Sequence, residues 1–356
     1  MVKDQRLTIG IPKEIKPAEY RVAGLPEHVR QLRDIGCRVV IQRHAGDGSR
    51  FSDAEYRAAG AQIVGTLPEV YDRADLLWKV KEILPPEFPL LRDRHVIFTY
   101  LHPAPRPRMV RALRRAGCTA IAYEEMVDDR GARPLLIPMS RMAGAGAVAL
   151  AAQFCQAKYA GCGKLLFRTP GSLPAVITIL GGGTAGQAAA RAALAAGATV
   201  RLLETDPARL RRLARSFRRA AVVRSDSRAI RRLLPDTDVL IHSTFWMPGD
   251  PHLVTRDMLG LMKPGSLIMD VSADPHGGIE SSEITTHDKP IRVVNGILHY
   301  AVQNIPSLFS RSASEALSKV TWPYLKLMAT CGVPLALRRS RLLRRGVVLW
   351  RGSAPT

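Results

Sequence analysis

A glycine-rich turn offers the clearest chemistry in this sequence. Gly181, Gly183 and Gly186 form a G-x-G-x-x-G pattern that directly follows the apolar run AVITIL and opens an alanine-rich helical stretch. In such a turn the first glycine allows the tight bend, the second lets a pyrophosphate approach the backbone, and the third lets helix and strand pack closely. The free N–H groups and the dipole of the helix N-terminus favour an anion there. The pattern therefore predicts a dinucleotide site.

Glu204 indicates which dinucleotide this site binds. It ends the next apolar run, TVRLLE, at about twenty residues from the turn, where an acidic residue accepts hydrogen bonds from a ribose 2′-OH and repels a 2′-phosphate. Arg201 precedes it on the same run and is expected to face the other side of the strand. The sequence therefore predicts NAD, rather than NADP, as the cofactor.

Three cationic or titratable residues stand next to apolar runs in the first part of the chain. Lys81 follows LLWKV, His102 follows HVIFTYL, and Arg21 lies shortly after LTIGI. By residue type alone, Lys81 is either a surface charge or a cation at the rim of a site, and a lone histidine or loop arginine is usually structural. Lys79, two residues from Lys81, lies on the same face if the strand continues, so it is a competing candidate.

The elements that position these residues alternate between strands and helices. Short apolar runs and helical stretches follow one another over residues 7–137, and a second such series begins with the glycine turn. This pattern predicts mostly parallel sheets. We expect an α/β fold of two Rossmann-like, doubly wound domains with an interdomain cleft. Residues 1–139 with 311–356 form the substrate domain, and residues 140–310 form the NAD-binding domain. Ligands of such sheets bind outside the carboxyl ends of the strands.

Composition limits the partners of the chain. The formal net charge is +21, but the arginines are spread along the sequence without interleaved aromatic residues, which favours a solvated surface over a nucleic-acid site. No run of eighteen apolar residues occurs, so no membrane span is expected. The five cysteines are scattered and form no CxxC pair, which indicates reduced thiols in a cytoplasmic protein and no metal site.

Several motifs resemble one known family. IGIPKEIKPAEYRVAGLP, LLWKVKE, FTYLH, AIAYEE, PLLIPMS, ILGGGTAG, KPGSLIMDVSAD and HYAVQNIP occur in this order over residues 7–330. Together they resemble the alanine dehydrogenase and transhydrogenase-subunit family. The resemblance implies an NAD-dependent oxidoreductase that converts L-alanine, or a close analogue, to a 2-keto acid and ammonia, reversibly as reductive amination. It also implies a homo-oligomer with a small-molecule substrate.

The resemblance also implies roles for residues of the first domain. Arg21 in YRVA matches the arginine that grips the substrate carboxylate, as a planar guanidinium can do through two parallel bonds. Lys81 in KVKE matches the lysine that faces the carboxylate or the keto oxygen. His102 in TYLH matches the acid–base histidine, and a reference pKa of about 6.5 suits that task.

Further roles follow for the second domain. Asp274 in DVSAD matches the aspartate that acts across the cleft, near the nicotinamide, whereas Asp270 lies within the strand and is expected to be structural. Ser140 in PMS and Asn304 in VQNIP match positions that contact the phosphates and the nicotinamide region of the cofactor.

The loop around Asp274 departs from the alanine dehydrogenase pattern. It reads ADPHGGIE, with one residue more than the D-Q-G-G form, and Pro103 directly follows His102. These forms resemble the saccharopine and carboxyethyl-ornithine dehydrogenases, which join a keto acid to an amino acid. A dehydrogenase of that type is therefore the alternative, and a transhydrogenase-like nucleotide-binding subunit is a more remote one. The role of the arginine-rich tail, residues 332–356, stays open.

Overall fold

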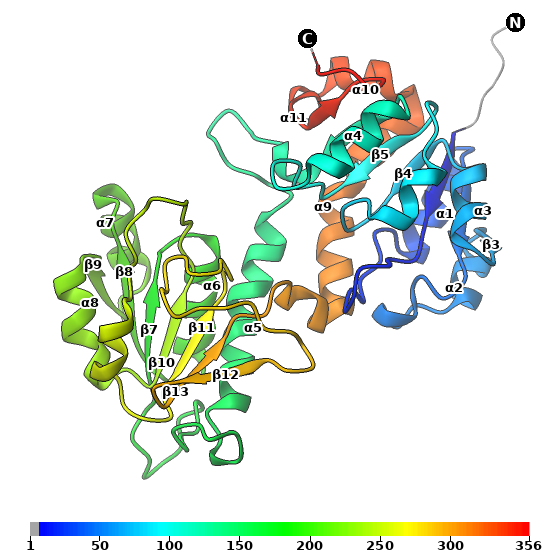
Figure 1. Cartoon of the computed structure of the whole chain (residues 1–356). Coiled ribbons are helices and arrows are strands. Elements are labelled where there is room, and N and C mark those ends of the chain that lie inside the picture. Colours follow the sequence, from blue (N-terminus) through cyan, green and yellow to red (C-terminus); the bar gives the residue numbers. More distant parts are fainter. Residues whose placement is uncertain (1–6, 356) are drawn as a thin grey trace, which may run out of the picture. The chain divides into compact units, whose positions relative to one another are not determined.

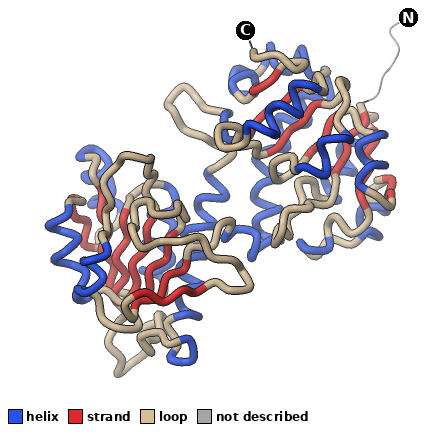
Figure 2. Tube along the Cα trace, viewed as in Figure 1, coloured by secondary structure: helices blue, strands red, loops and turns tan. Residues whose placement is uncertain are grey.

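Two parallel-stranded sheets organise the chain, and each belongs to its own compact unit. The computed structural model describes residues 7–355. Contacts divide the chain into a first unit, Met1–Met139 with Ser307–Thr356, and a second unit, Ser140–Pro306. Figure 1 traces the elements along the chain, and Figure 2 separates helices, strands and loops.

The first sheet has the order β14-β6-β5-β4-β1-β2-β3. Its strands are β1 (Thr8–Ile11), β2 (Arg38–Gln42), β3 (Gln62–Val64), β4 (Leu76–Trp78), β5 (Val96–Thr99), β6 (Thr119–Ala122) and β14 (Val347–Leu349). Neighbouring strands are parallel except β14, which runs antiparallel to β6. Because the chain builds β1 to β3 on one side and then crosses to β4, the strand order reverses between β1 and β4. A ligand site is expected outside the strand ends at this reversal.

Helices connect the strands of the first unit. They are α1 (Pro26–Asp34), α2 (Asp53–Ala58), α3 (Leu67–Arg73), α4 (Pro107–Arg115), α9 (Ser310–Cys331), α10 (Val333–Arg339) and α11 (Arg341–Arg345), with 3-10 turns η1 (Asp47–Ser49), η2 (Pro85–Leu90), η3 (Tyr123–Glu125) and η7 (Ile305–Phe309). Capping boxes start α2 and α3: the hydroxyls of Ser52 and Thr66 accept from the third helical N–H, and Glu55 and Glu69 reach back.

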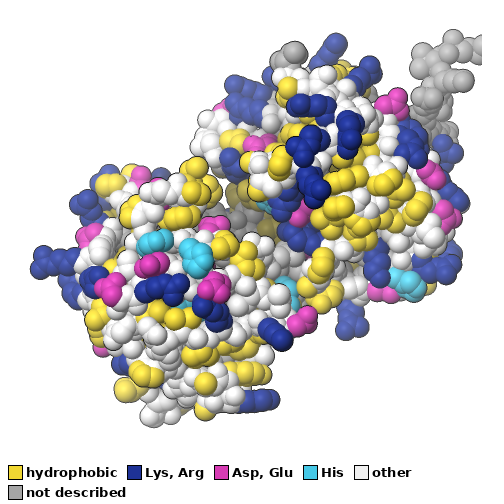
Figure 3. Space-filling model, in the orientation of Figure 1, with side chains coloured by type: hydrophobic (Ala, Val, Ile, Leu, Met, Phe, Trp, Pro, Cys, Tyr) yellow, Lys and Arg dark blue, Asp and Glu magenta, His cyan; other side chains and the backbone are white. Residues whose placement is uncertain are grey.

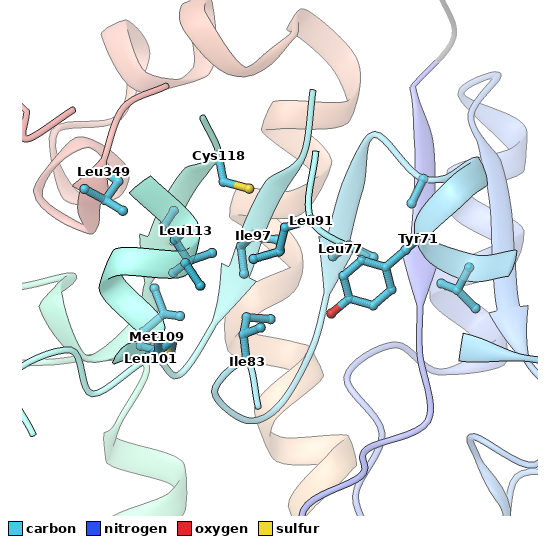
Figure 4. Packing of buried hydrophobic residues seen from close by; sticks show 14 of the residues in the cluster. Tyr71, Leu77, Ile83, Leu91, Ile97, Leu101, Met109, Leu113, Cys118 and Leu349 are labelled. Atoms are coloured by element: carbon cyan, nitrogen blue, oxygen red, sulfur yellow. The ribbon is translucent and has the colours of Figure 1, made fainter. Parts of the chain in front are cut away.

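The core of the first unit includes residues from the loops that carry Lys81 and His102 and from the tail. Figure 4 shows Ile83 and Leu101 within a buried apolar cluster that also contains Leu77, Ile97 and Leu349. Ile83 follows Lys81 by two residues, and Leu101 immediately precedes His102, so packing fixes the loops that carry both side chains. Leu349 comes from β14. The tail is therefore a structural part of the first unit.

The second sheet repeats this design. Its order is β12-β13-β11-β10-β7-β8-β9, parallel except for the edge pair β12 and β13. Its elements are α5 (Ile137–Phe154), β7 (Val176–Leu180), α6 (Thr184–Ala195), β8 (Thr199–Glu204), α7 (Pro207–Ser216), β9 (Ala221–Arg224), α8 (Ser227–Leu233), β10 (Val239–His242), β11 (Leu267–Asp270), β12 (Ile291–Val294) and β13 (Ile297–Tyr300), with turns η4 (Ala157–Tyr159), η5 (Leu234–Asp236) and η6 (Arg256–Leu261). The prediction of two Rossmann-like α/β sheets is confirmed.

The positively charged side chains are dispersed over the visible surface. Figure 3 shows Lys and Arg side chains on the visible faces of both units, interspersed with acidic and apolar side chains. Among the described helices, none is long and apolar enough to cross a membrane.

Candidate functional site

Arg21 lies on the loop after β1 and is buried with a carboxylate partner. Its Nε and Nη2 donate to the two oxygens of Glu19 at 2.7 and 2.6 Å, and its Nη1 lies 3.1 Å from Met139 Sδ. Burial acts to lower the pKa of Arg21, but Glu19 outweighs it and raises that pKa, so the guanidinium stays charged. Glu19 thus presents Arg21 as a fixed cation in this loop. The sequence-based reading missed Glu19, although its place two residues from Arg21 was a usable signal.

The two candidate lysines have different environments. β4 ends at Trp78, so Lys79 and Lys81 lie on the loop beyond it. Lys79 is fully buried, with its Nζ 3.2 Å from Glu14 Oε2 and 2.8 Å from Glu87 Oε1. Lys79 is therefore a structural cation. Lys81 is half-buried, and burial together with the nearby Arg21 charge lowers its pKa to about 8.

His102 follows β5 in an unusual backbone conformation. Its φ of 46° lies in the left-handed region, which a non-glycine residue adopts only when its surroundings hold it there. The Glu124 carboxylate supplies this restraint, because it accepts the backbone N–H groups of both Leu101 and His102. The His102 ring also stacks on Tyr100, with ring centroids 6.0 Å apart and planes at 5°. The imidazole is therefore held in one orientation.

The charges around His102 keep its imidazole neutral. Burial, followed by the positive charges of Lys81 and Arg106, lowers the pKa of His102 to about 4. Its side chain is 40% exposed and accessible from solvent. A neutral, accessible imidazole beside two cations can accept a proton from a bound substrate. The structure thus brings Lys81 into electrostatic contact with both Arg21 and His102.

A buried carboxylate organises the cations at this edge of the sheet. Glu82 Oε1 accepts from Lys16 Nζ at 2.8 Å and from Arg106 Nη2 at 2.9 Å. Arg106 also donates to the carbonyl of His102 at 3.1 Å, which ties the histidine loop to the lysine loop. Burial acts to raise the pKa of Glu82, but the Lys16 hydrogen bond and charge outweigh it and lower the pKa to about 2. No local sequence pattern indicated this network, since its members are up to 90 residues apart.

In the second unit, the glycine turn after β7 has the geometry that a pyrophosphate needs. Gly181 has φ of 99°. A Cβ at Gly186 would lie 1.8 Å from the Gly181 carbonyl oxygen, so only glycine lets α6 approach β7 this closely. By contrast, a Cβ at Gly183 would meet no atom within 4 Å, because this glycine faces open space at the N-terminus of α6. The three glycines therefore fit a bound dinucleotide.

Glu204 ends β8 beside this turn. Its Oε2 accepts from the Gly182 N–H at 3.1 Å and from Arg209 Nη1 at 3.2 Å, and its Oε1 accepts from the Asp206 N–H at 2.9 Å. Partial burial acts to raise the pKa of Glu204, but the Asp206 and Arg209 hydrogen bonds outweigh it and lower the pKa. Arg201 points elsewhere, to the Leu233 carbonyl, and Arg209 is the arginine that the sequence-based reading missed.

A cavity of about 230 Å³ opens at the same strand ends of the second sheet. Glu204 and Gly181 line it, together with Thr244 and Trp246 from the loop after β10. It adjoins both the glycine turn and Glu204, the two features that the sequence assigned to a dinucleotide.

The remaining candidates also lie in the second unit. Asp274 follows β11 and is half-buried, and burial together with the Asp270 charge raises its pKa. Ser140 lies in the first turn of α5, and Asn304 adopts φ of 73° between β13 and η7. The roles of these three residues stay predictions. Among the described residues, no group of histidine, cysteine and carboxylate side chains is arranged to hold a metal ion.

Comparisons with known proteins agree across both units. The model of the alanine dehydrogenase/PNT N-terminal domain matches residues 10–143, and that of the C-terminal domain matches residues 147–355. The chain is 41% identical to the alanine dehydrogenase of Bacillus subtilis over 345 residues, which cover 96% of this chain and 90% of the relative.

Solved structures give the same result. An L-alanine dehydrogenase matches with a TM-score of 0.92 and 36% identity, covering 98% of this chain and 96% of the other. A transhydrogenase from Sinorhizobium meliloti matches with a TM-score of 0.83 and 28% identity, covering 98% of each chain. Because the family models and the Bacillus subtilis relative cover nearly the whole chain, it belongs to the alanine dehydrogenase/PNT family.

Proposed function

We propose that the protein is an NAD-dependent amino-acid dehydrogenase that converts L-alanine, or a close analogue, to the 2-keto acid and ammonia, and runs in reverse as a reductive amination. One observation carries the proposal: a half-buried cation, Lys81, acts electrostatically on both a buried arginine, Arg21, and a neutral histidine, His102. This set matches the needs of a 2-amino acid, which has a carboxylate to bind and an amine to deprotonate. The names of the relatives support the same substrate class.

The first unit binds the substrate and moves protons in this proposal. Arg21 and Lys81 hold the carboxylate, and Lys81 also stabilises negative charge on the oxygen of the keto acid. His102 enters the reaction neutral because of its low pKa, so it accepts a proton from the substrate ammonium or from the water that adds to the imine. Binding of an anionic substrate neutralises the nearby cations and increases the basicity of the imidazole.

The second unit binds the cofactor in this proposal. The glycine turn holds the pyrophosphate, and Glu204 binds the ribose hydroxyls, with Ser140 and Asn304 as further contacts. When bound, the nicotinamide supplies the acceptor for the hydride that leaves the substrate carbon. Asp274 orients the amine or the water. Its raised pKa means that this carboxyl group takes up a proton at a higher pH than an exposed aspartate does.

The loop after β11 supports the alternative substrate. Pro275 and His276 are exposed on it, and its sequence, ADPHGGIE, carries the resemblance to the saccharopine and carboxyethyl-ornithine dehydrogenases. A saccharopine- or opine-type dehydrogenase would use this loop to admit an amino acid in place of ammonia as the amine.

A cofactor-linked screen tests the proposal. NADH consumption is measured with pyruvate and other 2-keto acids, each with ammonia and separately with lysine, ornithine and alanine as amine. We expect oxidation of NADH with pyruvate and ammonia. Oxidation only with a diamino acid would establish the alternative, and no oxidation with any pair would contradict both and favour a transhydrogenase-like subunit.

Two variants test the assigned residues. His102→Ala and Asp274→Ala should each reduce turnover by about 100-fold or more, since a positioned acid or base contributes that much. NADH binding, followed by fluorescence, should survive in both. Wild-type turnover in either variant would contradict the role assigned to that residue.

We also propose that the protein is a homo-oligomer and that it works in the cytoplasm. Its five cysteines, all of them in described positions, are free, and free thiols are typical of a reducing compartment. Light scattering coupled to gel filtration measures the oligomer, and a monomeric mass would contradict this part of the proposal.

A further inference from the structure

A buried histidine–aspartate pair lies between the glycine turn and the Asp274 loop of the second unit. His242 ends β10 and Asp270 ends β11, directly opposite each other in the parallel register. His242 is fully buried, and Asp270 is 2% exposed. The Nδ1 of the ring lies 2.8 Å from Asp270 Oδ1, and its Nε2 lies 2.6 Å from Thr244 Oγ1. A hydroxyl, an imidazole and a carboxylate thus form one hydrogen-bonded row.

One end of this row reaches the dinucleotide turn. Thr244 lines the cavity beside Gly181, and its methyl group is packed so closely that a Cβ at Gly181 would lie 2.8 Å from Thr244 Cγ2. The hydroxyl of Thr244 is therefore held at the edge of the cavity by the ring of His242. Whichever of Nε2 and the hydroxyl donates in this bond, the hydroxyl keeps at least one further hydrogen-bonding position for a ligand.

The other end of the row holds the loop that carries Asp274. The Asp270 carboxylate accepts the Ala273 N–H at 3.0 Å and also the Ser282 hydroxyl, in addition to the His242 ring. Ala273 has φ of 49°, so this bond restrains a left-handed residue directly before Asp274. Gly278 closes the loop against the ring: a Cβ there would lie 2.4 Å from His242 Nε2.

We propose that His242 and Asp270 are positioning residues that hold the Asp274 loop and orient the Thr244 hydroxyl toward the bound dinucleotide. The two loops are also joined directly, because Ser272 Oγ donates to the Thr244 carbonyl at 2.6 Å. This inference rests on the proposed function for the role of Asp274. The part that concerns Thr244 and dinucleotide binding can be tested without measuring turnover. Asp270, which the sequence indicated as structural, thereby acts on the site through its neighbours.

The charges near Asp274 make the effect of the His242–Asp270 pair measurable through the pKa of Asp274. Burial and the Asp270 charge raise the pKa of Asp274, whereas the His242 charge lowers it. The other titratable side chains around this loop are His252, whose Nδ1 lies 2.8 Å from the Gly277 carbonyl, His276 and Glu280. None of them is altered by substitution of His242. Loss of the imidazole should therefore raise the pKa of Asp274.

The test uses the full-length protein with three variants. Asparagine in His242→Asn places an amide near Nδ1 and keeps a donor for Asp270, but it loses the Thr244 contact and the imidazole charge. Thr244→Val removes only the hydroxyl. His299→Asn is the matched control, because His299 is a buried histidine of β13 that bonds Ser281 and the Ile297 carbonyl instead.

Three readouts separate positioning from general damage: NADH affinity by fluorescence, the pH profile of turnover, and the melting temperature. Thr244→Val should weaken NADH binding about two- to tenfold, the worth of one hydrogen bond, with an unchanged pH profile. His242→Asn should weaken NADH binding by the same factor, and the acid limb of its pH profile of turnover should also move to higher pH. The KM for the amino acid should stay within about twofold, since the residues that hold its carboxylate, Arg21 and Lys81, lie in the first unit.

Two results would overturn the inference. One is a folded His242→Asn variant with wild-type NADH affinity and pH profile. The other is an equal shift in both readouts in His299→Asn. If His242→Asn fails to fold, the NADH affinity of Thr244→Val alone tests whether the Thr244 hydroxyl contributes to dinucleotide binding. Asp274→Asn distinguishes the two proposals: if it keeps full turnover, the role of Asp274 in the proposed function fails, while the NADH affinities still test the pair.

Discussion

Lys81 should make the binding of a substrate carboxylate depend on pH in the alkaline range. A lysine in water has a pKa near 10.4, but burial and the Arg21 charge lower that of Lys81 to about 8. In the free enzyme the cation is therefore present at neutral pH and lost as the pH rises through 8. If only the charged lysine binds the anion, the apparent dissociation constant rises by the factor 1 + 10^(pH − 8), which is about 11 at pH 9.

This rise has a ceiling that the charge itself sets. A hydrogen bond to a charged group contributes about 1.5–3 kcal/mol, so complete loss of the lysine charge should weaken binding by about 10- to 150-fold. The affinity should therefore fall between pH 8 and about pH 10 and then level off. Arg21 stays charged throughout, because Glu19 raises its pKa.

Competitive inhibition by oxamate measures this effect. Oxamate carries the carboxylate of a keto acid but has no amine that titrates, so the pH dependence reports on the protein alone. In Lys81→Arg the inhibition constant should be flat to pH 10, because a guanidinium stays charged. In Lys81→Met it should be high and flat. A constant that does not change in the wild type between pH 7 and 10, or an equal slope in Lys81→Met, would refute the reasoning.

Three further predictions concern the glycine turn, the cofactor preference and the buried Lys79. Gly186→Ala should cost about 1–3 kcal/mol in urea unfolding, because its Cβ meets a backbone oxygen, whereas Gly183→Ala should keep wild-type stability and lose NADH affinity in a fluorescence titration. Glu204→Ser should narrow the NADH-over-NADPH preference in kcat/KM, and an unchanged ratio would argue against its ribose contact. Lys79→Met should lower the free energy of unfolding by about 3–5 kcal/mol, because it leaves two carboxylates buried, while Lys81→Met should change it little.

Features carried by local pattern could be predicted from the sequence. Gly181, Gly183 and Gly186 adopt the predicted turn because strand, turn and helix follow one another directly in the sequence. Burial of the apolar run AVITIL makes it a central strand, so the turn must lie at the end of that strand. The parallel sheets follow from the alternation of elements for the same reason.

Features that depend on partners far along the chain could not be predicted. The alternation rule placed Lys79 and Lys81 on one face, but β4 ends at Trp78, so the rule does not apply to them. The two lysines differ in environment because Lys79 pairs with Glu14, 65 positions away, and with Glu87. Likewise, the contact of His242 with Asp270 requires the strand order, which the sequence does not display.

The antiparallel strand β14 has a consequence for how the protein is made. β6 has β5 on one side, and its other edge is covered only when Val347–Leu349 pairs with it. During synthesis the ribosome must therefore produce the whole of the second unit before the first sheet can close. The second unit is continuous, so it can fold while that edge is still open. An uncovered edge is a template for pairing between nascent chains, and truncation before residue 347 should favour aggregation over assembly.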